Sequence, residues 1–489
     1  MVGGKTRNMP SPAPNKANSE ATNEFAQRFH NTPVTRVMCI GAGPVGTSTM
    51  AIMARHMPDV QITVFDDDPA VICGCQTGAP HFYEPGIQEL VASLRGKNLA
   101  FSPAFDECVQ AAQVIFVCIN TPLKKSGIGS GRAADLSGWE TMARRIASAS
   151  RGECKIVVEC STIPVATGET MRKVLHAVGD AAKYEVLCFP SFYRGGQAIK
   201  DLEAPQRVLL GCQDTPSALI AQEAVTNLLS RWIPRENIVH SNLWSAELSK
   251  LAQNAMKAQR ISSANAVSAL CERTGADLDE VMSVVGTDSR IGPGYLKACP
   301  GMGGPTLITN LSMLVYICET MKLHDVAEYW QHVLTMNEYQ QQRFCNNIVH
   351  TMVNVKGKKI ALMGFAYKPN TSDCRQSPAI DIAKAMIAEG ARLAVFDPQV
   401  RPEVIIGALG GDVPSLQVTI CKSAMEALEG ADAMVLVTDW ECFSTLDMSH
   451  VYTVMNKPAF VFDSRGTFDN SALNKIGFIS YRIGKANLR

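Results

Sequence analysis

Short apolar runs and helical patterns alternate along the first half of this chain. Val37–Ile40 is an apolar run, and a helical pattern through Met57 separates it from a second run, Val60–Phe65. Short continuous runs of this kind are typical of parallel strands that are buried on both faces. Three more such runs follow with helical stretches between them: Val114–Ile119, Lys155–Glu159 and Val186–Phe189. The alternation predicts an α/β unit built around a parallel sheet.

From Trp244 to about His350 the pattern changes. Ala, Leu, Met, Gln and Glu dominate, strand-like runs vanish, and apolar residues keep helical spacing at Leu248, Leu251, Ala255 and Ala258. The spacing predicts an all-helical section. A long helix here could join two domains and supply a dimer face.

Strand-like runs return in the last third of the chain, at Lys359–Gly364, Leu393–Pro398, Ala433–Thr438 and Ala459–Asp463. We therefore predict two Rossmann-like, doubly wound parallel-sheet domains joined by a central helical dimerisation section. The expected boundaries are 34–242 for the first α/β domain, 243–352 for the helical section and 353–489 for the second α/β domain. Residues 1–33 are rich in Asn, Pro, Ser and Ala and are predicted to be a disordered tail.

Composition narrows the class of protein. The chain holds 46 Lys and Arg and 46 Asp and Glu, so no overall field attracts nucleic acid or an anionic membrane. Because the first residues are polar we expect no signal peptide, and no apolar run reaches the roughly 18 residues of a membrane helix. Sixteen scattered cysteines suggest reduced thiols in a cytoplasmic protein. Cys73 and Cys75 lack a partner pair at ligand spacing, so we expect no metal site.

A glycine-rich turn follows the first predicted strand. Gly41, Gly43 and Gly46 have the spacing of a dinucleotide-binding fingerprint, in which a tight turn brings the backbone and a helix N-terminus to a pyrophosphate. Asp66 ends the second strand, twenty positions beyond Gly46. Its carboxylate would accept hydrogen bonds from a ribose diol and repel a 2′-phosphate, so we predict NAD as the cofactor.

Longer strings resemble the UDP-glucose 6-dehydrogenase family, within the UDP-glucose/GDP-mannose dehydrogenases. They are Tyr83–Gly86, Asn120–Pro122, Gly131–Leu136, Ser161–Val165, Glu247–Leu251, Gln259–Ser263, Tyr329–Gln331 and Gly364–Lys368. The similarity runs in order from about Val34 to Gly484 and looks closest to the animal-type enzymes. Members of this family oxidise UDP-glucose twice at C6, reducing two NAD, and hold the intermediate on a cysteine.

The resemblance assigns roles to residues of this chain. It implies that Asn120, Thr121 and Thr162 contact the cofactor, and that Thr162, Lys250 and Asn254 surround C6. It places Arg290 at a sugar nucleotide across a subunit boundary. The basic residues implied at the UDP end, in the second α/β domain, are Lys368, Arg375 and Arg465. Family dimers build hexamers, and Gly131–Leu136 matches a loop linked to subunit packing, so we expect a homo-oligomer or a hetero-oligomer with an active relative.

The chain differs from the family in the two strings that carry the nucleophile and the residues that assist it. In the family string Gly-Phe-Gly-Gly-Ser-Cys-Phe-Gln-Lys-Asp, this chain places Thr306 at the cysteine, Thr309 at the lysine and Asn310 at the aspartate. The string Asn-Pro-Glu-Phe-Leu-Ala-Glu-Gly becomes Phe189–Gly196, with Ser191 and Gly195 at the two glutamates. Val71 stands where the resemblance implies an arginine near the cofactor.

These changes predict a specific deficit. A hydroxyl has a far higher pKa than a thiol, so Thr306 needs an adjacent base, and the Asn310 amide is none. We therefore expect a pseudoenzyme that binds NAD and a UDP-sugar and regulates an active relative by co-assembly. Two alternatives stay open: an active dehydrogenase with another sugar or an aldehyde product, using Lys250 for proton removal, and full activity through a relocated cysteine, with Cys299 the nearest.

Overall fold

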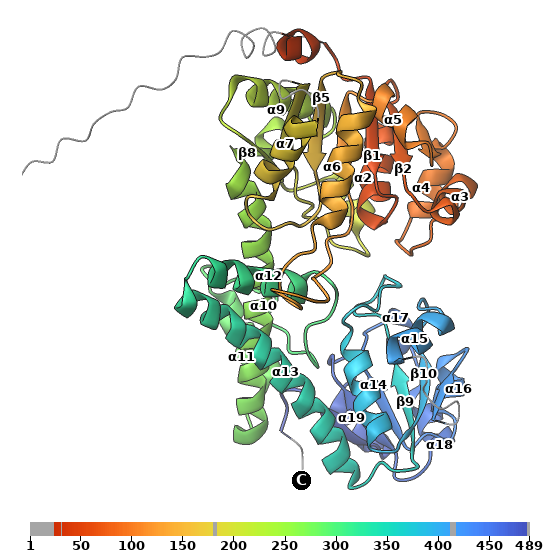
Figure 1. Cartoon of the computed structure of the whole chain (residues 1–489). Coiled ribbons are helices and arrows are strands. Elements are labelled where there is room, and N and C mark those ends of the chain that lie inside the picture. The colour runs from red at the N-terminus through yellow and green to blue at the C-terminus, as the bar shows by residue number, and fades with distance from the viewer. Residues whose placement is uncertain (1–23, 31, 179–182, 411–416, 487–489) are drawn as a thin grey trace, which may run out of the picture.

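The computed structural model describes residues 24–30, 32–178, 183–410 and 417–486, and it contains two α/β domains joined by long helices (Figure 1). The first domain has an eight-stranded sheet in the order β3-β2-β1-β4-β5-β6-β7-β8. Its strands are β1 (Arg36–Ile40), β2 (Gln61–Phe65), β3 (Leu99–Ser102), β4 (Val114–Val117), β5 (Lys155–Glu159), β6 (Tyr184–Cys188), β7 (Val208–Cys212) and β8 (Ile238–Asn242).

Helices cover both faces of this sheet. Val37 and Cys39 of β1 pack into one core, and Met38 and Ile40 pack into the other, so both faces of this strand are buried. This explains the continuous apolar run in the sequence and confirms the doubly wound architecture. On one face lie α2 (Pro44–His56), α3 (Pro69–Thr77), α4 (Ile87–Leu94) and α9 (Pro216–Leu229), and on the other α5 (Phe105–Ala111), α6 (Ser137–Ala149) and α7 (Thr167–Val178).

One strand near the far edge of the first sheet runs against its neighbour. β7 pairs with β6 in the antiparallel direction, and β8 then pairs with β7 in parallel. The chain between β6 and β7 holds only the short α8 (Ala198–Glu203), which packs on α2. β8 is largely exposed and polar, so its sequence carries no apolar run that could reveal it.

The predicted disordered tail is too long at its C-terminal end. Residues 24–29 form a helix, in which Phe25 and Phe29 are buried and join the core of the first domain together with Val34. Two aromatic residues four positions apart lie on one helix face, which is why this segment packs although its surroundings are polar. Residues 1–23 lie outside the described part of the chain.

The central section is helical, as predicted for 243–352. It consists of α10 (Leu243–Thr274), α11 (Leu278–Thr287), α12 (Leu307–Thr320) and α13 (His324–Met352). Asn242 caps α10 by accepting from Ser245 N at 2.7 Å, and Gly275 ends it with a φ of 81°. α10 leaves the first domain, passes α12 and continues alongside α13 (Figure 1).

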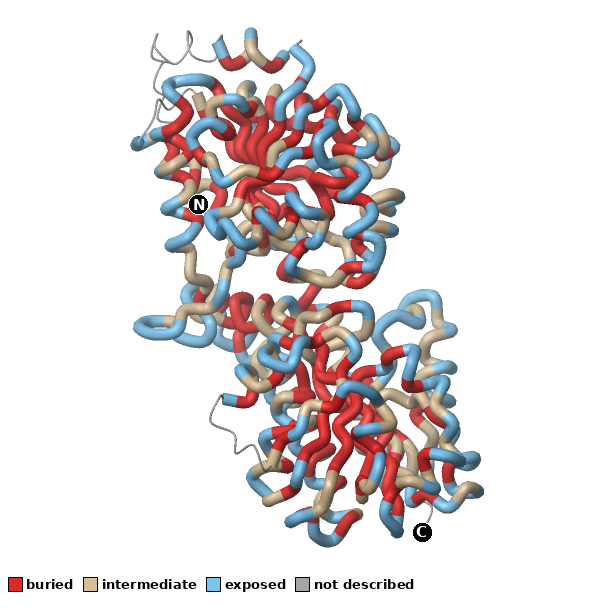
Figure 2. Tube along the Cα trace, turned by 90° about the vertical axis from the view of Figure 1, so that its right-hand side faces the viewer, coloured by how far each residue is buried: buried red, intermediate tan, exposed pale blue. Residues whose placement is uncertain are grey.

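The second α/β domain has a six-stranded, fully parallel sheet in the order β11-β10-β9-β12-β13-β14. Its strands are β9 (Lys359–Met363), β10 (Arg392–Phe396), β11 (Val418–Ile420), β12 (Ala433–Leu436), β13 (Phe460–Asp463) and β14 (Ile479–Arg482). Its helices are α14 (Pro378–Ala388), α15 (Pro402–Leu409), α16 (Ala424–Leu428), α17 (Glu441–Ser444), α18 (Met448–Val454) and α19 (Asn470–Ile476). Figure 2 shows that the strands of both sheets are the buried centre of their domains. Among the described helices, none has the length and apolarity needed to cross a bilayer.

Candidate functional site

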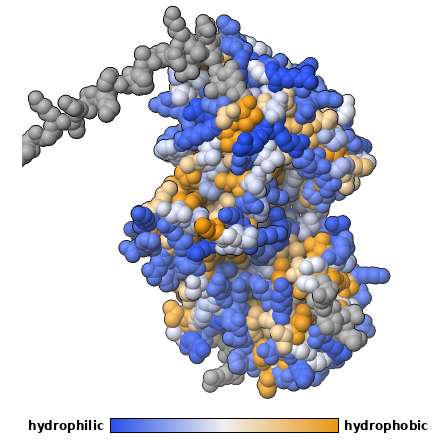
Figure 3. Space-filling view, viewed as in Figure 1, coloured by the Kyte–Doolittle hydropathy of each residue, from blue (hydrophilic) through white to orange (hydrophobic). Residues whose placement is uncertain are grey.

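The three parts of the chain meet at a waist between the two α/β domains (Figure 3). Tyr83 N donates to Ser372 Oγ at 3.3 Å, and Lys368 Nζ donates to Gly195 O, so the second domain contacts two loops of the first. Gly304 N, just before α12, donates to Gln376 O at 3.3 Å. These bonds bring together the loop 189–196, the start of α12 and the loop that follows β9. We call this region the interdomain crevice.

The glycine turn adopts the predicted dinucleotide-binding geometry. Gly41 has a φ of 106°, and a Cβ there would lie 2.5 Å from Cys118 O. A Cβ at Gly46 would lie 2.0 Å from Gly41 O, so helix α2 can pack on the turn only without a side chain. Both positions therefore require glycine for backbone reasons.

The surroundings of the turn fit NAD. A Cβ at Gly43, the N-cap of α2, would meet nothing within 4 Å, so the helix N-terminus is open toward a ligand pyrophosphate. Asp66 lies beside it: its carboxylate accepts from Ala42 N at 2.9 Å and from Asp68 N at 3.1 Å and is partly exposed. Val71 packs on the core from α3 and adds no charge here. The turn and Asp66 are thus brought together as predicted.

Asn120, Thr121 and Thr162 follow the adjacent strands β4 and β5. Thr121 Oγ1 donates to Thr162 O at 2.6 Å, which ties the two loops together. Glu247 of α10 fixes the second loop, because its carboxylate accepts from Ala166 N and Gly168 N, each at 2.7 Å. Burial raises the pKa of Glu247 to about 7. We did not predict this role, although Glu247 begins one of the family-like strings.

Lys250 and Asn254 lie one helical turn apart on α10 and are both buried. Lys250 Nζ donates to Ser191 O, and burial, with a further contribution from Lys257, lowers its pKa to about 8. Asn254 Nδ2 has no hydrogen-bond partner among the described residues. A buried amine that readily loses its proton and an unpaired amide donor are groups suited to a substrate hydroxyl. The structure therefore brings these two predicted residues together.

The loop 189–196 is held by a residue that the sequence did not single out for a role. Glu84 is buried, and its carboxylate accepts from Gly196 N at 2.6 Å and from Ala198 N at 2.7 Å. Burial raises its pKa. Glu84 lies in the string Tyr83–Gly86, but its target is more than 100 residues away, so spacing alone could not reveal the contact. The loop thus keeps its anchor although its own glutamate positions hold Ser191 and Gly195.

Thr306 precedes the first turn of α12, where its side chain is exposed. No described residue forms a hydrogen bond with its hydroxyl, so no base stands ready to activate it. Asn310, one turn later, is buried, and its Nδ2 is unpaired. Thr309 is half-buried and uncharged. The resemblance implies a nucleophile at this helix N-terminus, and positions 306, 309 and 310 of this chain hold two hydroxyls and an amide.

Cys299 is the cysteine nearest to Thr306 in the sequence, seven positions away. It is 7% exposed and its Sγ donates to Gly301 O at 3.2 Å. The backbone of Cys299 is also fixed. Asn265 Oδ1 accepts from Cys299 N at 2.9 Å, and Gln340 Nε2 donates to Cys299 O at 2.7 Å. The thiol is therefore directed into the helical section and is held by its surroundings.

The basic residues expected at the UDP end lie in the second domain, and two of them follow strands of the same sheet. Lys368 follows β9 and Arg465 follows β13, and β12 separates these two strands. Arg465 Nε donates to Val437 O at 2.6 Å, at the end of β12. Arg375 forms a two-pronged pair with Asp373, with Nη2 2.7 Å from Oδ2. In this arrangement Lys368 is the cation that directly contacts the first domain.

Arg290 is not brought to the site by its own chain. Its side chain is 87% exposed and its guanidinium pairs with Asp288, two residues earlier. A long exposed arginine on the loop after α11 is free to reach a neighbouring molecule. This position agrees with the expected role across a subunit boundary but does not test it.

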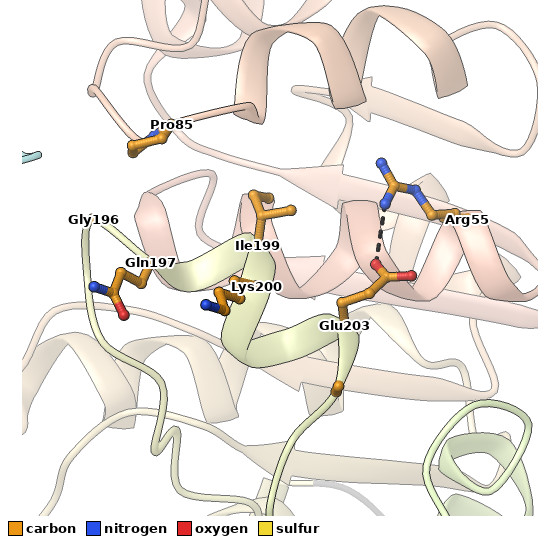
Figure 4. A pocket seen from close by; sticks show the side chains of 8 residues that line it. Arg55, Pro85, Gly196, Gln197, Ile199, Lys200 and Glu203 are labelled. Carbon is orange, nitrogen blue, oxygen red and sulfur yellow. Dashed lines mark hydrogen bonds and ion pairs between the residues drawn. The ribbon is translucent and has the colours of Figure 1, made fainter.

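A surface cavity of about 610 Å³ lies next to the crevice on the far side of loop 189–196. Figure 4 shows α8 along it, with Arg55 paired to Glu203 at one end, 3.0 Å apart. It is lined by Arg55, Pro85, Gly196, Gln197, Ile199, Lys200, Glu203 and Ala204. None of the residues predicted for the site lines it, so we do not assign the site to it.

Comparison with known proteins is consistent across the whole chain. Family models match residues 35–232 (UDP-glucose/GDP-mannose dehydrogenase family, NAD binding domain), 244–339 (central domain) and 361–470 (UDP binding domain). UDP-glucose 6-dehydrogenase 2 of Oryza sativa subsp. japonica is 44% identical over 470 residues, 92% of this chain and 97% of the relative. UDP-glucose 6-dehydrogenase 2 of Arabidopsis thaliana is 45% identical over 468 residues, with the same coverage.

A solved UDP-glucose dehydrogenase from Pyrobaculum islandicum matches with a TM-score of 0.80 at 26% identity, covering 93% of this chain and 99% of that one. UDP-D-ManNAc dehydrogenase from Pyrococcus horikoshii has the same fold, with a TM-score of 0.77, 22% identity, and coverage of 93% and 100%. These matches confirm the predicted family and the predicted fold class. The two relatives of known sequence named above are plant proteins, and the closer likeness to animal-type enzymes stays a prediction.

Proposed function

Because the chain belongs to the UDP-glucose/GDP-mannose dehydrogenase family, we propose that it binds NAD and a UDP-sugar but has lost most oxidation of UDP-glucose to UDP-glucuronate. The family's NAD-binding and UDP-binding domains are both present. The glycine turn and Asp66 would hold NAD, which would supply a hydride acceptor for the sugar carbon. Completing the acid then depends on the protein's own side chains, which must hold the aldehyde covalently and manage water and protons.

One observation carries this proposal: an exposed threonine hydroxyl without a basic partner occupies the nucleophile position. Among the described residues, none forms a hydrogen bond with the Thr306 hydroxyl, and the neighbouring positions offer the Asn310 amide and the Thr309 hydroxyl. A hydroxyl is a poor nucleophile near neutral pH. An ester formed on it would also be hydrolysed less readily than a thioester, because an alkoxide is a poorer leaving group than a thiolate. Ser191 supplies no carboxylate to assist hydrolysis.

Calorimetry with UDP-glucose and with NAD, run beside an absorbance assay for NADH, tests the proposal. Binding of both ligands with NADH formation at least about 1,000-fold slower than in an active relative is expected, because activated nucleophiles and their bases act as a unit. Turnover to glucuronate at a relative's rate would contradict it.

A second function is favoured by Lys250. Its lowered pKa, about 8, leaves a fraction of neutral amine near pH 7 to 8, and Asn254 lies one helical turn away on α10. These groups suffice for removal of a hydroxyl proton, so the alternative is an active dehydrogenase with an aldehyde product or another nucleotide sugar. Absence of NADH with a panel of UDP- and GDP-sugars would eliminate it.

We further propose that the chain forms oligomers through its central helices and regulates an active relative by co-assembly. α10 exposes Trp244, Leu248, Met256 and Leu270, and a groove of about 480 Å³ lies between α10 and α13. Exposed apolar side chains on adjacent helices favour a partner. Arg132, in the loop linked to packing, pairs with Glu319 of α12 at 2.5 Å and orders that loop. A pull-down with an intact relative that yields no mixed oligomer would exclude the regulatory role.

A cytoplasmic location is part of the proposal. All sixteen cysteines are free thiols in the structure, and most of them are buried. Free thiols persist in reducing compartments, whereas secreted proteins usually pair them. Fractionation of cells that express the chain tests this location.

A further inference from the structure

The changes around the reacting side of the crevice alter its charge, and not only its chemistry. Compared with the family strings quoted above, the glutamates at 191 and 195 and the aspartate at 310 are lost, together with the lysine at 309. Arg194 is added where the string has alanine. Three carboxylates and one lysine are therefore replaced by neutral residues and one arginine is gained, so the region becomes markedly more positive.

The structure gathers further cations at the same place. Lys250 and Lys257 lie seven positions apart on one face of α10. Lys250 Nζ and the Arg207 guanidinium carbon each lie 5.3 Å from the centre of the Phe192 ring. Burial lowers the pKa of Lys257, and the charges of Arg207 and Arg194 lower it further, so these groups are close enough to repel one another.

Carboxylates compensate only part of this charge. Asp201 is occupied by Arg194, with Oδ1 2.7 Å from Nη2 and Oδ2 2.9 Å from Nε. Glu84 is occupied by the backbone of Gly196 and Ala198. Among the described residues, Lys250 and Lys257 form no ion pair with any carboxylate. Repelling, half-buried cations without counter-ions are costly unless a ligand supplies negative charge.

A glutamate at position 195 would lie next to a lysine of the second domain. A side chain at Gly195 would point toward Tyr367 Oη, 3.7 Å from its Cβ, and toward Lys368 Nζ, 4.0 Å away. Because position 195 carries no side chain, Lys368 is left without the carboxylate of the family string. At position 191 a serine replaces the glutamate of the family string, and Lys250 Nζ donates to the backbone carbonyl of this serine.

We propose that the preferred ligand of this crevice is a nucleotide sugar that already carries a carboxylate, such as a UDP-uronic acid, and not the corresponding alcohol. This inference rests on the proposed binding of a UDP-sugar. The three carboxylates of the family strings are absent here, while Lys250 and Arg207 lie on Phe192 and Lys257 lies near Arg207. The chain would then act as a receptor for the acidic product of its active relatives.

Titration calorimetry of the full chain with UDP, UDP-glucose and UDP-glucuronate tests the inference. We expect UDP-glucuronate to bind at least about ten-fold more tightly than UDP-glucose, a typical effect of one charge-assisted contact. Lys257→Gln and Arg194→Gln should each reduce that ratio by about three-fold or more, and Lys475→Gln, which changes an exposed cation on α19, should leave it unchanged.

The three ligands separate the two claims. Binding of UDP and both sugars with equal affinity, or with UDP-glucose the tighter, would overturn the inference and leave UDP-sugar binding intact. That result would also mean that the cations serve the diphosphate, which all three ligands share. Failure of all three to bind would overturn the proposed function itself. A ratio that is unaffected by both Lys257→Gln and Arg194→Gln would refute the assignment to these cations.

Discussion

The glycine turn and the segment 301–310 are both loops that lead into a helix, but they differ in which residues of the family strings they retain. At the turn, Gly41 and Gly46 retain positions where any Cβ would strike backbone, at 2.5 Å and 2.0 Å. Segment 301–310 also keeps its glycines, with Gly301 at a φ of 128° and Gly304 at 86°. At 306, 309 and 310 the same segment holds two threonines and an asparagine, where the family string quoted above has cysteine, lysine and aspartate.

The comparison separates what the fold requires from what the reaction requires. Glycines are needed by the backbone itself, and replacing them costs stability whether or not the protein is an enzyme. A nucleophile and its base make little contribution to folding, so they can be lost without structural consequence. Binding geometry and covalent chemistry can therefore diverge within one chain.

The most demanding way to break the comparison is to restore the chemistry. A variant with Ser191→Glu, Thr306→Cys, Thr309→Lys and Asn310→Asp should form UDP-glucuronate at least about 100-fold faster than the natural chain, since a cysteine at this helix N-terminus gains thiolate character. Thr306→Cys alone should gain less than about ten-fold. Product chromatography measures the rates of both variants. If the variant with four substitutions binds UDP-glucose and is inactive, the crevice itself has changed.

Two glycine variants test whether the glycine turn is required for stability or for NAD binding. Gly46→Ala should lower the free energy of unfolding by about 3 kcal/mol and abolish NAD binding, because its methyl group would collide with Gly41 O. Gly43→Ala has open space for its Cβ, so it should keep the wild-type stability and weaken only NAD binding. Denaturant unfolding and NAD calorimetry give the two readouts. Equal stability of both variants would contradict the packing argument.

The anchor of loop 189–196 provides a smaller effect. Glu84→Gln should lower the free energy of unfolding by about 2 kcal/mol, because an amide accepts at one oxygen only and leaves one of two buried N–H groups unpaired. The matched control is Glu89→Gln, an exposed residue on α4, with an expected change within about 0.5 kcal/mol. Urea unfolding compares the two, and indistinguishable midpoints would argue against the anchor.

The smallest effect concerns any residual alcohol oxidation. Burial lowers the pKa of Lys250 from 10.5 to about 8, and only the neutral amine is a base, so the rate should rise with pH up to about 8 and then level off. Lys250→Arg stays charged and should abolish the rise. NADH absorbance between pH 6 and 9 provides the profile. A residual rate that is flat across this range would exclude Lys250 as the base.

The sequence predicted those parts of the molecule that depend on local pattern. The buried strands of both sheets, the helical section and the turn with Asp66 all follow from apolar runs, helical spacing and glycine geometry. Polar edge strand β8 and the antiparallel return of β7 carry no such local signal. The helix at 24–29 was missed because its two phenylalanines lie among polar residues.

The candidate site residues came from the resemblance and their roles stay predictions, whereas the residues that support them were not predicted. Glu84 and Glu247 stand in recognisable strings, but their targets lie 112 and 79 residues away in the chain, and only the folded structure joins them. The cations of the crevice were likewise hidden, because Lys257, Arg207 and Arg194 come from three separate segments. Tertiary contacts of this kind leave no periodicity in a single sequence.

The central claim is that this crevice binds without completing the oxidation, and the yield of NADH per UDP-glucose tests it most directly. With protein, NAD and UDP-glucose incubated for the time in which an equal amount of an active relative consumes all the sugar, the account predicts almost no UDP-glucuronate and far less than one NADH per sugar. Two NADH per UDP-glucose, released with glucuronate at the rate of an active relative, would contradict it.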